Sequence, residues 1–314
     1  MTIAIISHEK CDLHSNGSPR HPESPQRLDA IRGQLSAAGV DAYCEHYPAV
    51  FATKTQLKSV HDGGYVDHVF ASSPGEGQLI RLDGDTGMNE HSLDAALYGA
   101  GAAIMAVDKV MSDSHDKAFC IIRPPGHHAG RAHSAGFCIF NNVALAALHA
   151  LEQYGLQRVA IVDFDVHHGD GTEEIVADDS RILFCSSFQH PYYPYSGADS
   201  DFSNVINLPM KAGTGGVEWR PVVQESWLPA LEAFQPELVI ISAGFDSHQD
   251  DDMGGFNLLE EDYVWITNEL CRLAAKHAQS RVVSCLEGGY ELMSLGRSAV
   301  AHVEALSACD SPLG

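Results

Sequence analysis

The chain contains no Cys-x-x-Cys pair. Its eight cysteines are scattered, at positions 11, 44, 120, 138, 185, 271, 285 and 309. This spacing argues against a cysteine-ligated zinc knuckle and against a disulfide framework. Several of the thiols stand inside apolar runs, which is typical of reduced cysteines in a cytoplasmic protein.

Long apolar runs and basic residues are also scarce. No stretch reaches the length needed to span a membrane, and the N-terminal run Ile3-Ala-Ile-Ile6 is too short for a signal peptide. Only 19 Lys and Arg stand against 42 Asp and Glu, and the formal net charge is −23. That charge argues against binding to nucleic acid through its phosphates, whereas it would favour the approach of a cationic substrate. We therefore expect a cytoplasmic protein that binds neither membrane nor nucleic acid.

Internal repeats and linker-like boundaries are absent, so we expect residues 1–314 to form a single domain. Apolar runs instead alternate with helical patterns along the chain. The runs predict strands at 3–7, 118–122, 159–162, 182–187, 238–242 and 281–286, and the patterns predict helices at 92–112, 141–154, 217–234 and 260–278. This alternation predicts an α/β fold in which a parallel sheet has helices on both faces. We interpret the polar segments 61–65 and 250–252 as loops.

The clearest chemical signal lies at the end of one predicted strand. Asp163, Asp165 and His167 follow the apolar run 159–162 at alternate positions, so their side chains share one face of an extended chain. Ligands bind at the carboxyl ends of the strands in open α/β sheets, and carboxylate and imidazole suit zinc. The alternative is a strand that ends in a polar turn, but three convergent ligands and the adjacent His168 favour a metal site.

A second apolar strand ends near Asp246, which should reach the same edge of the sheet. We therefore predict that Asp246 binds zinc together with Asp165 and His167. Three protein ligands leave a coordination position open for catalysis. The alternative for Asp246 is the N-cap of a helix.

Two adjacent histidines, His127 and His128, follow the rigid turn Arg123-Pro-Pro-Gly126. They could be two metal ligands, or a general base and its electrostatic partner. Asp163 and Asp170 could orient them through their other ring nitrogens. The alternative is a pair of surface histidines in a loop.

Aromatic residues follow further strand ends. Tyr290 comes directly after Gly288-Gly289, where its phenol could donate a hydrogen bond to a polarised carbonyl oxygen; the alternative is a packed core tyrosine. Gly136-Phe137 and the tyrosines at 192, 193 and 195 could wall an apolar channel, although ordinary packing would explain each ring singly. Another predicted strand ends at Ser186-Ser187. Because five strand ends carry such residues, we predict one composite site.

Together these segments resemble the zinc-dependent histone deacetylase family, which includes bacterial histone deacetylase-like amidohydrolases and acetylpolyamine amidohydrolases. The resemblance covers nearly the whole chain and implies the arginase–deacetylase fold, a single α/β domain with an eight-stranded parallel sheet. The pattern is closest to the class II branch, but Asp170 stands where that branch often has Asn and resembles class I. The matching stretches are RHPESPQR at 20–27, RPPGHHAG at 123–130, GFCIFNN at 136–142, DFDVHHGDGT at 163–172, AGFD at 243–246 and EGGY at 287–290.

Residue roles follow from the resemblance. It implies a carbonyl-polarising Tyr290 and a Phe137 that forms one wall of the acyl-lysine channel, beside which we expect Gly136 and Tyr193 to bind substrate. It implies a catalytic Zn²⁺ held by Asp165, His167 and Asp246, and tandem histidines His127 and His128 paired with Asp163 and Asp170. It also implies a structural K⁺ near Asp163, Asp165, His167, Ser187 and Phe188.

The implied reaction is hydrolysis of an N-acetyl amide. His128 would take a proton from water and return it to the leaving amine, while His127 would act electrostatically. We expect acetyl-lysine in proteins or peptides as the substrate, with acetylated polyamines as the alternative. A ureohydrolase is a rival enzyme, but Asp246 lacks the second Asp two residues later that fits its two manganese ions. A non-catalytic acyl-lysine binding protein is a rival of another class. The sequence leaves both a monomer and a homo-oligomer open.

Overall fold

The core of the computed structural model, which describes residues 2–112 and 114–308, is one parallel sheet of eight strands. The strand order is β2-β1-β5-β10-β9-β6-β7-β8, and every pair of neighbours is parallel. The strands are β1 (Ile3–Ser7), β2 (Cys44–Pro48), β5 (Lys117–Cys120), β6 (Val159–Asp163), β7 (Ile182–Gln189), β8 (Val205–Met210), β9 (Leu238–Ala243) and β10 (Val282–Leu286). The predicted α/β class with an eight-stranded parallel sheet is confirmed.

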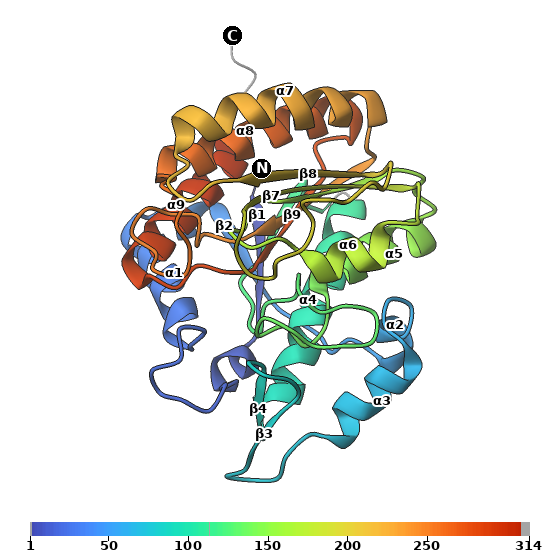
Figure 1. Ribbon diagram of the computed structural model, residues 1–314, viewed down its shortest axis with the longest axis vertical. Coiled ribbons are helices and arrows are strands. Elements are labelled where there is room, and N and C mark those ends of the chain that lie inside the picture. The colour runs from blue at the N-terminus through green and yellow to red at the C-terminus, as the bar shows by residue number, and fades with distance from the viewer. Residues whose placement is uncertain (1, 113, 309–314) are drawn as a thin grey trace.

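Helices cover both faces of this sheet (Figure 1). On one face α7 packs against β7 and β8, α8 against β9, and α9 against β1; on the other face α4 packs against β1, β5 and β10, α5 against β6 and β9, and α6 against β7. The helices are α1 (Gln26–Ala37), α2 (Lys54–Leu57), α3 (Gly63–Ala71), α4 (Ser92–Met111), α5 (Asn142–Tyr154), α6 (Asp170–Val176), α7 (Gly216–Phe234), α8 (Glu260–His277) and α9 (Leu292–Ala308), with 3₁₀ helices at Glu9–Leu13 and Val40–Tyr43. No helix of the described chain is long and apolar enough to cross a membrane.

Some elements differ from the prediction. The edge strands β2 and β8 carry partly exposed residues rather than a continuous apolar run, so their patterns resemble loops. The segment 61–65, which we predicted as a loop, contains the start of α3, because the Asp62 side chain caps the backbone N–H groups of Gly64 and Tyr65. A separate antiparallel hairpin of β3 (Leu79–Arg81) and β4 (Gly87–Asn89) lies apart from the main sheet (Figure 1).

The predicted chemistry gathers because of the strand order. β5, β10, β9, β6 and β7 are consecutive neighbours in the middle of the sheet. His127, Tyr290 and Asp246 follow the carboxyl ends of β5, β10 and β9, Asp163 is the last residue of β6, and Ser187 lies near the carboxyl end of β7. Asp163 lies directly opposite Ser186 on one side and Ser242 on the other. All five strand ends therefore meet at one edge of the sheet, where parallel α/β proteins bind ligands.

Candidate active site

Three buried side chains converge after β6 and β9. Ligand atoms of Asp165, His167 and Asp246 all lie within 4.8 Å of one another. Nδ1 of His167 is 3.0 Å from Oδ1 of Asp165 and 3.2 Å from Oδ2 of Asp246. That Asp246 oxygen is buried and makes no hydrogen bond within the described residues. Two carboxylates and an imidazole fit a zinc ion, and the unpartnered oxygen is explained by a cation at this point.

Backbone groups hold the two carboxylates in place. The N–H of Val166 donates to Oδ1 of Asp246, and the N–H of Gly288 donates to Oδ2 of Asp165. A Cβ atom at Gly288 would lie 2.1 Å from Oδ2 of Asp246, so glycine is required there. Although burial opposes it, the hydrogen bond that the ring donates to Asp165 and the negative charge of the nearby Asp246 carboxylate raise the pKa of His167 to about 10. A bound divalent cation would reverse that shift, because metal ligation needs the neutral imidazole.

The tandem histidines are buried beside this triad, each only 3% exposed. Nδ1 of His127 lies 2.9 Å from Asp163, and Nδ1 of His128 lies 2.7 Å from Asp170. Their other ring nitrogens are therefore the ones left for chemistry. The alternative of surface histidines in a loop is wrong, because the turn at 123–126 directs both rings inward.

The pKa values of the two histidines shift in opposite directions. Burial and the neighbouring His127 lower the pKa of His128 to about 4, although Asp170 opposes the shift. For His127, burial is outweighed by the charges of Asp165 and Asp163, which raise its pKa well above the ordinary value. These opposite shifts favour a neutral His128 as a proton acceptor and a charged His127 at neutral pH.

A cavity of about 200 Å³ opens onto these groups. Phe137 and Tyr193 form part of its wall, and the ring of Tyr193 meets that of His128 edge-on, with centroids 5.1 Å apart. Tyr195 does not contribute: it is 74% exposed, so the prediction that it walls the channel is wrong. The full lining is Asp85, His128, Gly136, Phe137, His167, Tyr192, Tyr193, Met253 and Tyr290.

Tyr290 enters the cavity from the turn after β10. Its ring meets Phe137 edge-on at 6.1 Å, and the Arg27 guanidinium lies 4.9 Å from the ring centroid. Oδ2 of Asp251 accepts the backbone N–H of Tyr290 at 2.6 Å and that of Glu291 at 2.9 Å. Asp251 is only 4% exposed, so the interpretation of 250–252 as a solvated loop is wrong for this residue.

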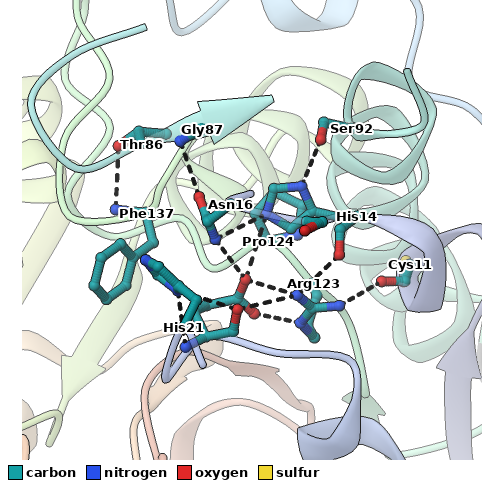
Figure 2. A network of polar contacts seen from close by, with 12 residues as sticks. Cys11, His14, Asn16, His21, Thr86, Gly87, Ser92, Arg123, Pro124 and Phe137 are labelled. Carbon is teal, nitrogen blue, oxygen red and sulfur yellow. Dashed lines mark hydrogen bonds and ion pairs between the residues drawn. The ribbon is translucent and has the colours of Figure 1, made fainter. Parts of the chain in front are cut away.

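Sequence reasoning assigned no role to a buried set of charged residues beneath the site. Oε2 of Glu287 accepts the N–H groups of Gly126 and His127, and Arg27 donates to the carbonyl oxygens of Glu287 and Gly289. Figure 2 shows Arg123 at the centre of a related network, in which it donates to the carbonyls of Cys11 and His14. Arg123 also pairs with the Glu23 carboxylate. The available signal was charge inside the matching stretches 20–27, 123–130 and 287–290, since buried charges require partners.

Comparisons with known proteins agree with this geometry. A family model described as the histone deacetylase domain matches residues 21–306. A probable deacetylase of Archaeoglobus fulgidus is 36% identical over 301 residues, covering 93% of this chain and 82% of that protein. A Mus musculus protein named polyamine deacetylase HDAC10 is 35% identical over 92% of this chain, which spans only 45% of that protein. The solved structure of the HDA15 HD domain is 35% identical in sequence and superposes with a TM-score of 0.92. The match covers 98% of this chain and 88% of the chain in that structure.

Proposed function

Because the chain belongs to the histone deacetylase family, we propose that it hydrolyses N-acetyl amides, with acetyl-lysine in proteins or peptides as its substrate. Family membership supports deacetylase activity. One observation carries the proposal for this chain: a single cavity joins His167 of the candidate metal triad, the neutral His128 and the phenol of Tyr290. A proton acceptor and a hydrogen-bond donor therefore flank the point where an amide carbonyl would lie.

We propose zinc as the ion held by Asp165, His167 and Asp246, since their buried donor set fits it. When bound, zinc supplies Lewis acidity and lowers the pKa of a bound water to about 7. We likewise propose K⁺ as a structural ion near Asp163, Asp165, His167, Ser187 and Phe188. These five residues are buried and lie at the ends of the adjacent strands β6 and β7.

The chain's own groups would divide the proton transfers and charge stabilisation among them. His128 accepts the proton of the attacking water at Nε2, because Asp170 holds Nδ1, and then gives it to the leaving amine. His127, charged and held by Asp163, stabilises negative charge without giving up its proton. Tyr290 donates to the carbonyl oxygen as it becomes an oxyanion.

The cavity favours a linear substrate. Aromatic rings on its walls suit the methylene chain of lysine, whose acetamide would reach the metal triad. Acetylated polyamines share this linear shape, and the similarity to a protein named polyamine deacetylase keeps them as the second candidate. A non-catalytic acyl-lysine binding protein is less favoured, because Tyr290 and both tandem histidines are in place. Cytoplasmic location and organisation as one domain over 1–314 stay predictions.

A substrate panel tests the proposal. Purified, metal-loaded protein should hydrolyse acetyl-lysine peptides and acetylated polyamines in an assay for the released amine, ranked by kcat/KM. We expect the peptides to rank first. A chelator should abolish turnover, and zinc should restore it. Binding of acetyl-lysine peptide without release of amine, in protein shown to contain the metal, would favour the non-catalytic binder.

A further inference from the structure

The wall of the cavity contains a strained turn. Gly136 and Phe137 both have left-handed backbone conformations, with φ of 53° and 70°. Glycine tolerates this region, but a bulky side chain seldom adopts it. Such a conformation persists only where the surrounding structure holds it, and it is enriched at functional sites. The groups that hold the backbone of Phe137 therefore determine the position of its ring in the cavity wall.

Two consecutive side chains of another loop hold this turn. Oδ1 of Asp85 accepts the N–H of Gly136 at 3.1 Å, and Oγ1 of Thr86 accepts the N–H of Phe137 at 3.2 Å. The Thr86 hydroxyl donates in turn to Oδ1 of Asp85 at 3.3 Å. Figure 2 shows Thr86 reaching the backbone nitrogen of Phe137. Thr86 is fully buried and Phe137 is half-buried, so loss of the hydroxyl removes the side-chain acceptor that holds this backbone N–H.

The loop that carries Thr86 joins β3 to β4 and is itself rigid. Oδ1 of Asp83 accepts the N–H groups of Asp85 and Thr86, and Oδ2 of Asp83 accepts the hydroxyl of Ser134. The hairpin is also tied to the buried network of Figure 2, since Oδ1 of Asn16 accepts the N–H of Gly87. The β3–β4 hairpin thus forms a platform for the Phe137 turn.

His21 supports the other side of the wall. Its ring meets that of Phe137 edge-on, with centroids 4.7 Å apart and planes at 80°. Nδ1 of His21 accepts the N–H of Glu23 at 3.2 Å, which fixes the imidazole. Phe137 is therefore placed between His21 on one side and Tyr290 on the other.

We propose that Thr86 and His21 are positioning residues that hold Phe137 in the cavity wall and so determine which acylated amines the protein hydrolyses. The inference rests on the proposed function and adds the origin of its preference for linear substrates. Without the Thr86 hydroxyl, the turn relaxes toward an ordinary φ and the Phe137 ring leaves the wall. Linear substrates then lose an apolar contact, while branched ones lose a steric barrier.

The experiment compares Thr86→Val, which removes the hydroxyl at nearly constant shape, with Thr86→Ser, which retains it. The first readout is amide hydrogen exchange of 134–140 in metal-loaded protein. The second is kcat and KM for acetyl amides of a linear and an α-branched amine. Thr86→Val should speed exchange of the Phe137 amide about tenfold and lower the linear-to-branched ratio of kcat/KM about tenfold, the factor for one lost hydrogen bond of ordinary strength. The change should lie mainly in KM. Thr86→Ser, which retains the hydroxyl, should keep both the amide exchange rate and the substrate ratio near their wild-type values.

His21→Ala provides a second arm, since His21 is partly exposed and its truncation spares the core. It should lower the same substrate ratio about threefold, as expected for one aromatic pair. Unchanged exchange in Thr86→Val overturns the positioning role. If Thr86→Val speeds exchange of the Phe137 amide but leaves the linear-to-branched ratio of kcat/KM unchanged, the role of Thr86 in specificity is overturned. An unchanged ratio in His21→Ala overturns the same role for His21. Wild-type protein that turns over no acyl amide refutes the proposed function instead, and the exchange measurement still decides whether Thr86 positions Phe137.

Discussion

Tyr290→Phe tests the proposed oxyanion stabilisation because the structure separates the ring from its hydroxyl. The ring is held by Phe137, Arg27 and the Asp251 contact to the backbone, and none of these contacts uses the phenol oxygen. Within the described residues that oxygen makes no hydrogen bond. Phenylalanine should therefore keep the fold and the metal, and the free energy of unfolding should change by less than about 0.5 kcal/mol.

The cost should appear only as negative charge develops on the substrate oxygen. Loss of one oxyanion donor lowers kcat by about 10²–10³, or roughly 2.7–4 kcal/mol of transition-state stabilisation. KM should change little, since the ground-state contacts remain. The assay is steady-state kinetics on an acetyl-lysine peptide, together with elemental analysis and chemical denaturation of the same sample.

Tyr65→Phe is the matched control. Its hydroxyl donates to the carbonyl oxygen of Ile139 at 2.7 Å in the core, away from the cavity. That variant should lose about 1 kcal/mol of unfolding free energy and keep its kcat. If Tyr290→Phe instead retains near wild-type kcat with metal bound, Tyr290 is a packing residue and the oxyanion role is wrong.

Three other outcomes are expected. Asp246→Ala should lose both the bound metal and turnover, measured by elemental analysis and amine release; full activity in verified metal-free protein would contradict the metal site. His61 accepts the Asn141 N–H at Nε2, and burial lowers its pKa from 6.5 to about 4. Its neutral form stabilises the fold fully above pH 6.5, and up to about 3 kcal/mol is lost as the pH falls toward 4. Urea titrations of wild type and His61→Gln should therefore differ less at pH 4.5 than at pH 7, and a constant difference would refute the shift. Because the net charge is −23, kcat/KM for a cationic acetylated amine should fall with added salt, whereas a flat profile would exclude electrostatic steering.

Local chemistry in the sequence was enough to predict that Asp165, His167 and Asp246 converge into a candidate metal site. The apolar runs before Asp163 and before Asp246 mark two buried strands. Strand β6 ends at Asp163, so the bend that follows it, and not alternation along the strand, brings Asp165 and His167 to this edge. The rule that parallel strands end at a common edge then brings the residues together. The convergence of Asp165, His167 and Asp246 could therefore be predicted from residue type and sheet class, whereas the strand period did not extend to Asp165 and His167.

Tertiary structure alone decided the remaining features. The order that places β10 between β5 and β9 depends on how helices pack on the two faces, and it brings Tyr290 next to the metal triad. The opposite pKa shifts of His127 and His128 arise from burial and from which charged groups lie nearby in space, so the pKa values of two identical neighbours in sequence shift in opposite directions. Thr86 lies about fifty positions from Phe137 in the sequence. No local sequence pattern predicts that its hydroxyl accepts the backbone N–H of such a distant residue. Residue type and spacing therefore determined which side chains are candidates for chemistry. Long-range packing determined which side chains hold that chemistry in position, because burial and charge proximity exist only after the chain has folded.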